Sequence, residues 1–137
     1  MKKITYIFYL CALSVFLSCC TNGFSYFVDK IEIASIEIIE YDNYQQNVTY
    51  HTLYVLNSDE ISNFIDDFSK IDFSRVYGDP YGFSGKCILI IYLNDDYEII
   101  CQKYIERRNI DNEVLTWHYY HADEAKFQEL LDRYTES

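Results

Sequence analysis

The sequence predicts a two-layer α+β domain, in which two helices pack on one face of a mainly antiparallel, five-stranded sheet. Five short segments rich in β-branched and aromatic residues are the expected strands, and most are joined by short polar connections typical of hairpins. Two other segments repeat apolar residues at i, i+3, i+4 and i+7, the spacing of one buried helical face. The expected element order is ββαβββα, and antiparallel sheets of this kind usually hold their helices on one face.

Two strands are expected before the first helix. Residues 30–38 alternate apolar and polar side chains, and the alternation changes phase near Ala34, which indicates a bulge. Residues 42–47 are polar and form the expected loop. Residues 48–56 are rich in β-branched and aromatic side chains, which favours a second strand.

The two helices are expected at residues 58–70 and after residue 123. Ser58 is the candidate N-cap of the first helix, and acidic residues occupy the first turn of both, where the helix dipole favours them. The apolar stripes consist of Ile61, Phe64, Ile65 and Phe68 in the first helix and Phe127, Leu130, Leu131 and Tyr134 in the second.

The remaining strands are expected at residues 87–93, 97–105 and 113–120, after a long glycine-containing connection over residues 72–85. The segment 87–93 is apolar without interruption, which is typical of a central strand covered on both faces. Because two helices cover one face, we expect the long connection or a binding partner to cover the other.

The composition describes one acidic, globular domain. The chain has 137 residues, of which half are hydrophobic, with 22 acidic and 11 basic residues and a formal net charge of −11. That apolar content is too high for an intrinsically disordered protein. The negative charge argues against nucleic acid or anionic lipid headgroups as electrostatically bound partners.

The N-terminus has the layout of a secretory signal. Lys2 and Lys3 precede an uncharged apolar stretch, residues 4–17, which is shorter than the about 20 residues of a membrane span. We therefore expect a signal peptide at residues 1–18, a tether at residues 19–29 and a single domain at residues 30–137. Plain secretion and an uncleaved signal anchor are the alternatives.

The end of this signal, Phe16-Leu17-Ser18-Cys19, resembles the lipobox of bacterial lipoproteins. The resemblance implies diacylglycerol attachment at Cys19, with Cys20 as the alternative, and a protein held on the outer face of the cell membrane by its acyl chains. Loss of the two signal lysines would reduce the basic residues from 11 to nine against 22 acidic ones, a formal charge of −13.

The segment from Asp72 to Cys101 is similar to that of small, uncharacterised lipoproteins of Gram-positive gut bacteria. The similarity lies in Gly-Asp-Pro, in Gly-Lys-Cys-Ile-Leu-Ile-Ile-Tyr and in Tyr-Glu-Ile-Ile. It implies no activity.

Cys87 and Cys101 are the candidates for a disulfide, which export would permit. A turn of two or three residues after the first strand of this hairpin would place Ile88 or Leu89 opposite Cys101. Cys87 would then be a diagonal neighbour, beyond the reach of a disulfide. Two buried free thiols are the alternative.

No motif for catalysis or for a cofactor is present in the sequence. His118 and His121 would point to opposite faces of a strand, which disfavours a metal site. We expect a protein that is not an enzyme and that uses neither a metal nor another cofactor; a hydrolase using His118 or His121 with a carboxylate is the least favoured alternative.

Aromatic residues are the candidates for binding a partner. Tyr81 and Phe83 lie in the long connection, and long loops on rigid scaffolds often bind partners. Tyr92 and Tyr97 would face each other across a two-residue turn, and Tyr50 would share a strand face with Tyr54. Tyrosine presents a rigid apolar ring with a polar tip, although it is also a strong strand former.

The leading hypothesis is therefore a non-enzymatic module that is anchored to the membrane and binds a protein or peptide. A structural component of the cell envelope without a specific ligand is the alternative from a different class.

Overall fold

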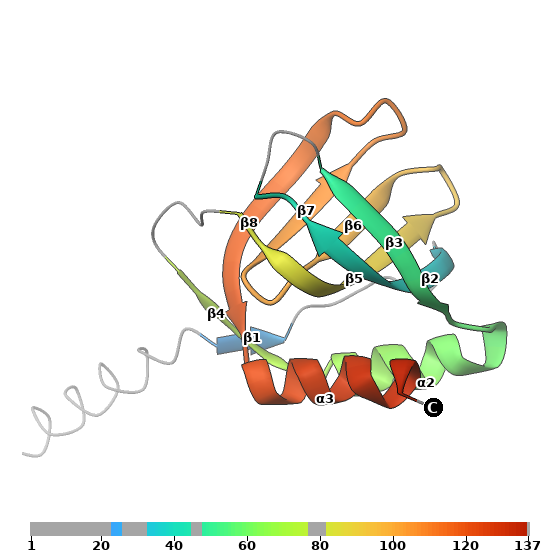
Figure 1. Cartoon of the computed structure of the whole chain (residues 1–137), viewed down its shortest axis with the longest axis vertical. Helices are drawn as coiled ribbons and strands as arrows, with labels where there is room; N and C mark the ends of the chain where they lie inside the picture. Colours follow the sequence, from blue (N-terminus) through green and yellow to red (C-terminus); the bar gives the residue numbers. More distant parts are fainter. Residues whose placement is uncertain (1–22, 26–32, 45–47, 77–81, 137) are drawn as a thin grey trace, which may run out of the picture.

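The computed structural model describes residues 23–25, 33–44, 48–76 and 82–136 (Figure 1). The expected signal peptide, Cys19, Cys20 and Tyr81 lie outside the described residues. In the described part of the chain, no helix has both the length and the apolar character needed to span a membrane.

The fold is α+β, as the sequence predicts, but the antiparallel sheet is larger than expected. Its eight strands are ordered β1-β4-β8-β7-β6-β5-β2-β3. The elements are β1 (Gly23–Ser25), β2 (Ile33–Asp42), β3 (Thr49–Val55), α2 (Ser58–Phe68), β4 (Asp72–Arg75), β5 (Ser84–Tyr92), β6 (Tyr97–Ile100), β7 (Tyr104–Arg108), β8 (Val114–Ala122) and α3 (Glu124–Thr135).

The prediction of five strands in the order ββαβββα is wrong at three places. β1 lies in the expected tether, and β4 lies in a connection expected to be a loop. The expected strand at residues 97–105 is divided into β6 and β7 by a tight turn at Gln102 and Lys103. The backbone carbonyls of these residues accept hydrogen bonds from Ala122 (2.9 Å) and Tyr120 (3.2 Å). Backbone groups of β8 therefore stabilise this turn, which contains no glycine or proline.

Both helices begin with side-chain caps. Asn57, rather than the expected Ser58, caps α2: its side-chain oxygen accepts from the backbone N–H groups of Asp59 and Glu60, both at 3.1 Å. The Glu60 carboxylate accepts in return from the Asn57 N–H at 2.9 Å, which completes a capping box. Asp123 caps α3.

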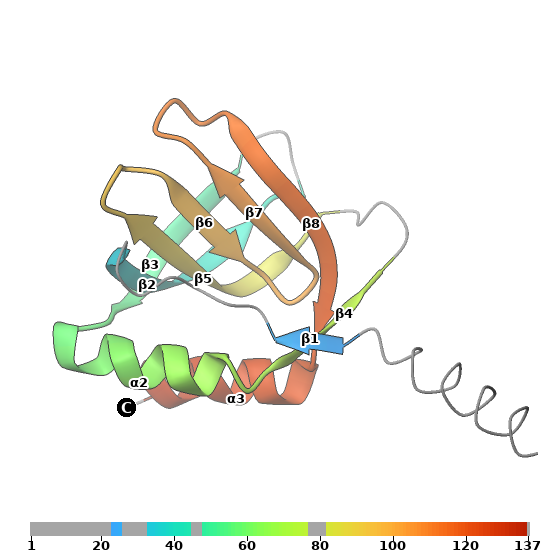
Figure 2. The ribbon, with the colours of Figure 1, turned by 180° about the vertical axis from the view of Figure 1, so that it is seen from behind.

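The predicted apolar stripes of the helices face the main core. Figures 1 and 2 show α2 and α3 side by side against one face of the sheet. Here the helices pack on alternate residues of the central strands, such as Ile88 and Ile90 of β5. The buried helical residues are Phe64, Ile65 and Phe68 from α2, and Phe127, Leu130 and Leu131 from α3.

The sheet curls strongly around its other face, which we call the inner face. In a flat sheet, β2 and β7 would lie about 14 Å apart, three strand spacings of about 4.8 Å. Yet the ring centroids of Tyr41 on β2 and Tyr104 on β7 are only 6.5 Å apart. Figures 1 and 2 show β2 and β3 rising on one side and β7 and β8 on the other.

The curl covers the second apolar face of β5. Cys87 and Leu89 of β5 are buried on the inner face together with Tyr41, Tyr104 and Phe83, the last residue before β5. The second face of β5 is thus covered by the curled sheet itself and by the end of the long connection. The sequence predicted that the connection or a partner would cover it.

Two details of strand pairing decide which side chains share a face. The predicted bulge near Ala34 is confirmed, because Ile33 lies opposite Tyr92 and Ser35 opposite Ile91. A second bulge occurs on β3, where Ile38 pairs with Tyr54 but Ile39 pairs with Thr52.

The hairpin of β5 and β6 has a three-residue loop, and both expected registers are wrong. Asp95 adopts a positive φ of 66°, and the Tyr92 N–H donates to the Asp96 carbonyl at 2.9 Å. Ile91 consequently pairs with Tyr97, and Ile88 pairs with Ile100. A left-handed residue in this place allows the strands to close around three residues.

Candidate binding surface

The aromatic residues expected to bind a partner do not form one surface. Phe83 is buried on the inner face, whereas Tyr92 is buried on the helix face. Tyr97 lies on the inner face, not opposite Tyr92, and its hydroxyl donates to the side-chain oxygen of Asn112. Tyr81 lies outside the described residues.

The most exposed apolar strand is β3, at one edge of the sheet. Among the described residues β3 pairs only with β2, and six of its seven residues are exposed. Tyr50 is 56% and Val55 is 55% accessible to solvent. Edge strands of this length usually carry a proline or a charged side chain, most often lysine, which prevents pairing with a further strand. β3 carries none of these, and its only titratable side chains other than tyrosine are those of His51.

The bulge in β3 distributes its tyrosines between the two faces. Tyr50 lies opposite Tyr41 on the inner face, whereas Tyr54 packs on the helix side with its ring centroid 6.2 Å from that of Tyr134. The expectation that Tyr50 and Tyr54 share a face is therefore wrong, because the extra residue, Leu53, reverses the alternation between them.

The edge is bordered by negative charge. Between residues 31 and 69 the chain has eight carboxylates and no lysine or arginine. Three of these carboxylates lie on β2, directly beside β3: Glu37 pairs with Val55, Glu40 with His51 and Asp42 with Thr49. Glu37 also accepts a hydrogen bond from the Thr52 hydroxyl at 2.7 Å. An extended segment that pairs with β3 would therefore lie in a negative potential.

The inner face continues from β3 to an aromatic wall on β7 and β8. The Trp117 ring stacks on Tyr104 at 4.9 Å and meets the edge of Tyr119 at 5.9 Å. Tyr104 is buried, whereas Trp117 remains 36% exposed. One ring of this wall thus remains open to solvent.

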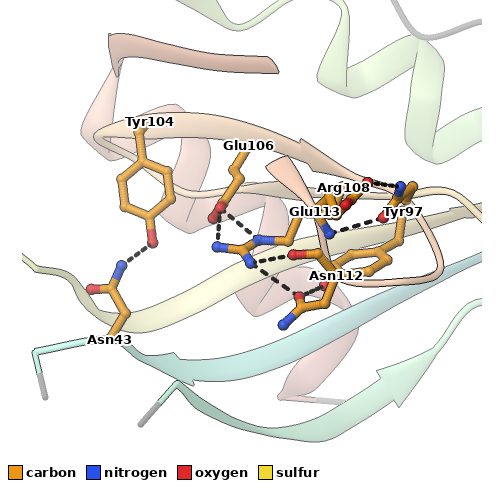
Figure 3. Close-up of polar contacts among 8 residues, drawn as sticks. Asn43, Tyr97, Tyr104, Glu106, Arg108, Asn112 and Glu113 are labelled. Carbon is orange, nitrogen blue, oxygen red and sulfur yellow. Dashed lines mark hydrogen bonds and ion pairs between the residues drawn. The ribbon is translucent and has the colours of Figure 1, made fainter. Parts of the chain in front are cut away.

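An ion pair with a buried carboxylate, Glu106 with Arg108, lies near Tyr104 of this wall (Figure 3). Glu106 is 1% exposed, and one of its carboxylate oxygens accepts from the Arg108 Nε at 2.6 Å. Arg108 also donates to the Asn112 backbone carbonyl at 2.9 Å and to its side-chain oxygen at 3.0 Å. The other carboxylate oxygen of Glu106 is buried without a hydrogen-bond partner among the described residues. Burial raises the pKa of Glu106, and Arg108 opposes that shift.

The phenols of the inner face are held neutral. The Asn43 amide donates to the Tyr104 hydroxyl at 2.6 Å, joining the loop after β2 to β7 (Figure 3). Burial raises the pKa of Tyr41 to about 12 and raises that of Tyr104 well above its ordinary value. Neither phenol can therefore serve as a base near neutral pH, and these contacts fix the inner face rather than supply reactive groups.

The histidines do not form a metal or catalytic cluster in the described part of the chain. His118 lies opposite Ile105 and stacks on Tyr120 at 5.5 Å, whereas His121 lies opposite Ser74. Their side chains point to opposite faces, since the two histidines are three positions apart on one strand and side chains alternate between its faces. No group of three His, Cys, Asp or Glu side chains there could hold a metal ion.

A shallow depression of about 130 Å³ between α2 and α3 is lined mainly by charged residues. Three of these charges form ion pairs with one another: Asp67 accepts from Arg133 at 2.6 Å and from Lys70 at 2.8 Å. These ion pairs satisfy Asp67 within the chain, so the depression does not offer it to a ligand.

Cys87 and Cys101 are both buried, and their thiols are free in this structure. Sequence reasoning named Tyr50 and Tyr54 of β3 among the aromatic candidates but did not identify the strand's edge as a binding surface, although a signal exists: residues 43–58 contain no charged side chain. The position of this strand at a sheet edge depends on the pairing of distant segments.

Comparison of the chain with protein-family models, with curated proteins and with solved structures found no match.

Proposed function

We propose that this protein is a lipid-anchored module on the outer face of the cell membrane, which binds an extended, cationic peptide segment along β3. The observation that carries the proposal is the exposed, uncharged edge of β3 beside the carboxylates of β2. Binding is not enzymatic: the peptide adds one strand to the sheet.

The edge supplies affinity through its backbone and specificity through its side chains. A peptide that extends a sheet forms main-chain hydrogen bonds, and its alternate side chains contact the two faces of the neighbouring strand. On the inner face these side chains would meet the ring of Tyr50. The negative potential from Glu37, Glu40 and Asp42 favours lysine or arginine in the peptide.

The same reasoning disfavours the first half of β8, whose outer side pairs with no other strand among the described residues. The first half of β8 is exposed at Val114 and Leu115, and β4 pairs only with residues 120–122 of this strand. The strand next to it, β7, carries Arg107 and Arg108. A cationic segment is therefore expected to choose β3.

The anchor follows from the lipobox resemblance at residues 16–19. A formal charge of −13 after removal of the signal peptide would repel the domain from anionic headgroups and keep β3 accessible on its tether.

Peptide binding to the detergent-solubilised protein tests the proposal. The probes are two fluorescein-labelled nine-residue peptides, one alternating Lys and Val and the other alternating Glu and Val, followed by fluorescence anisotropy. We expect the Lys/Val peptide to bind, and to bind more weakly at 0.5 M than at 0.05 M salt, because the screening length of the charges is about 4 Å at the higher and about 14 Å at the lower concentration. We expect no binding of the Glu/Val peptide.

Two matched variants locate the site. Val55→Lys introduces a protective charge into β3, whereas Val114→Lys makes the same change at a residue of similar exposure, 48%, on β8. We expect at least a tenfold loss of affinity for the first and less than a twofold change for the second. Equal affinity of the two variants, or equal binding of the two peptides, would refute the proposal.

Size-exclusion chromatography tests whether a second copy of the chain, rather than a peptide, pairs with β3. Two copies would each bring a strongly negative β2–β3 edge, so we expect a monomer. A dimer that Val55→Lys dissociates would show instead that β3 serves self-association.

A further inference from the structure

The β5–β6 hairpin places its two cysteines directly across from each other. Ile88 pairs with Ile100, so the next pair in the same register is Cys87 and Cys101. The sequence-based prediction of a diagonal relation fails because the three-residue loop lies at residues 93–95, which gives a register different from both registers considered.

The type of pair also suits a bond between these side chains. The hydrogen bond from the Tyr92 N–H to the Asp96 carbonyl makes these two residues a hydrogen-bonded pair. Hydrogen-bonded and non-hydrogen-bonded pairs alternate along an antiparallel ladder, and Cys87 with Cys101 is the fifth pair beyond it. It is therefore a non-hydrogen-bonded pair, the type in which facing side chains are closest. The Cα atoms of such a pair are about 4.5 Å apart, a separation that lies within the range found for disulfides.

The side chains meet in this arrangement. Both cysteines are completely buried in the inner-face cluster, beside Tyr41 and Tyr104. Next to the effect of burial, the neighbouring Cys101 thiol contributes to raising the pKa of Cys87. Two buried cysteines that face each other across neighbouring strands, at the Cα separation of a non-hydrogen-bonded pair, need no large movement of the backbone to be joined.

We infer that Cys87 and Cys101 are joined by a cross-strand disulfide in the exported protein. The inference rests on the proposed location outside the cytoplasm and not on peptide binding. The two thiols together lose two protons and two electrons, and a disulfide of an exported thiol oxidoreductase gains them and becomes a dithiol. A mixed disulfide between the oxidoreductase and one of the two cysteines is the intermediate.

The time of oxidation follows from the burial of the pair. Thiol–disulfide exchange requires an accessible thiolate, and burial raises the pKa of Cys87 above its ordinary value. The folded dithiol is therefore inert toward the oxidoreductase. The bond must form before Tyr41 and Tyr104 cover the hairpin, during folding after export.

Peptide mapping of the full-length protein from membranes tests the inference. Free thiols are blocked with N-ethylmaleimide in guanidinium without reductant, and the protein is then digested with trypsin. The peptide 87–103 follows Lys86, ends at Lys103 and contains both cysteines. We expect this peptide to carry no maleimide and to be two hydrogens lighter than its reduced form. Two maleimide groups on this peptide would overturn the inference.

Refolding separates the chemistry of the pair from the location of the protein. Reduced, unfolded full-length protein is refolded with a mixture of reduced and oxidised glutathione, and the same peptide is analysed. We expect the intramolecular bond in most molecules, whereas addition of oxidised glutathione after refolding should leave both thiols free. Failure to form the bond during refolding would overturn the geometric argument. If the bond forms during refolding but the membrane-derived protein has free thiols, oxidation in the cell is refuted. If Cys19 of that membrane-derived protein is acylated, the proposed location still holds.

Discussion

Removal of Arg108 should destabilise the protein by leaving Glu106 buried without its counter-charge. Glu106 is 1% exposed, and within the described part of the chain only one of its carboxylate oxygens is hydrogen-bonded, to Arg108. Breaking a buried ion pair from one side costs about 3 to 5 kcal/mol. The Arg108 side chain is 20% exposed, so Arg108→Met should cost about 3 kcal/mol, the lower end of that range.

The cost should depend on pH in a defined direction. Burial already raises the pKa of Glu106, and loss of Arg108 raises it further. The folded chain then binds a proton more tightly than the unfolded chain, so protonation favours folding, and this gain disappears as the pH rises through the pKa of the folded state. The variant should therefore be less destabilised at pH 5 than at pH 7.5.

Urea unfolding of the full-length protein, followed by circular dichroism at both pH values, measures these effects. Arg108 also contacts Asn112, whose positive φ of 66° is compatible with glycine, so Asn112→Gly serves as the control for that contact. Glu106→Leu combined with Arg108→Met should recover most of the lost stability, because no buried charge remains. A loss below 1 kcal/mol, an equal loss at both pH values or no recovery in the double variant would refute the reasoning.

Two further predictions concern the two cores. The pKa of Tyr41 is raised to about 12, so its neutral phenol should contribute fully to stability below pH 10, and this contribution should disappear as the pH rises to 12. In urea unfolding over that range, the free energy of unfolding of the wild type should fall by up to about 2 kcal/mol more than that of Tyr41→Phe. Leu131→Ala, at a completely buried position of α3, should cost about 3 kcal/mol, whereas the matched Leu115→Ala on β8, 48% exposed, should stay within about 0.5 kcal/mol. Parallel alkaline curves for the tyrosine pair, or equal unfolding midpoints for the leucine pair, would contradict these expectations.

The helices and the fold class could be predicted because their signals are local. The apolar stripes of α2 and α3 repeat within four residues, and Phe64, Ile65, Leu130 and Leu131 are buried as that spacing requires. The bulge near Ala34 was likewise visible as a break in alternation.

The hairpin register and β7 depend on contacts that the local sequence does not show. Several turn lengths fit the residues after Tyr92, and the positive φ of Asp95 selects one of them. The charged sequence of β7 resembles a loop, but its charges are used inside the fold. Glu106 pairs with Arg108, and the Arg107 guanidinium lies 4.5 Å from the centre of the Tyr92 ring.

The candidate surface could be predicted least. The sequence of β3 indicates a strand, but whether its outer side is paired depends on β2 lying between β3 and β5. The same non-local pairing buries Phe83 and Tyr92, two residues that the sequence suggested for binding.

Strand β5 contributes side chains to both hydrophobic cores, one on each of its faces. Ile88 and Ile90 belong to the core beneath the helices, whereas Cys87 and Leu89 belong to the inner face. Detachment of β5 would expose apolar side chains on both sides at once, so neither core can open without removing the support of the other. We therefore expect the domain to unfold as one cooperative unit and the amide hydrogens of β5 to exchange with solvent only when the whole domain opens.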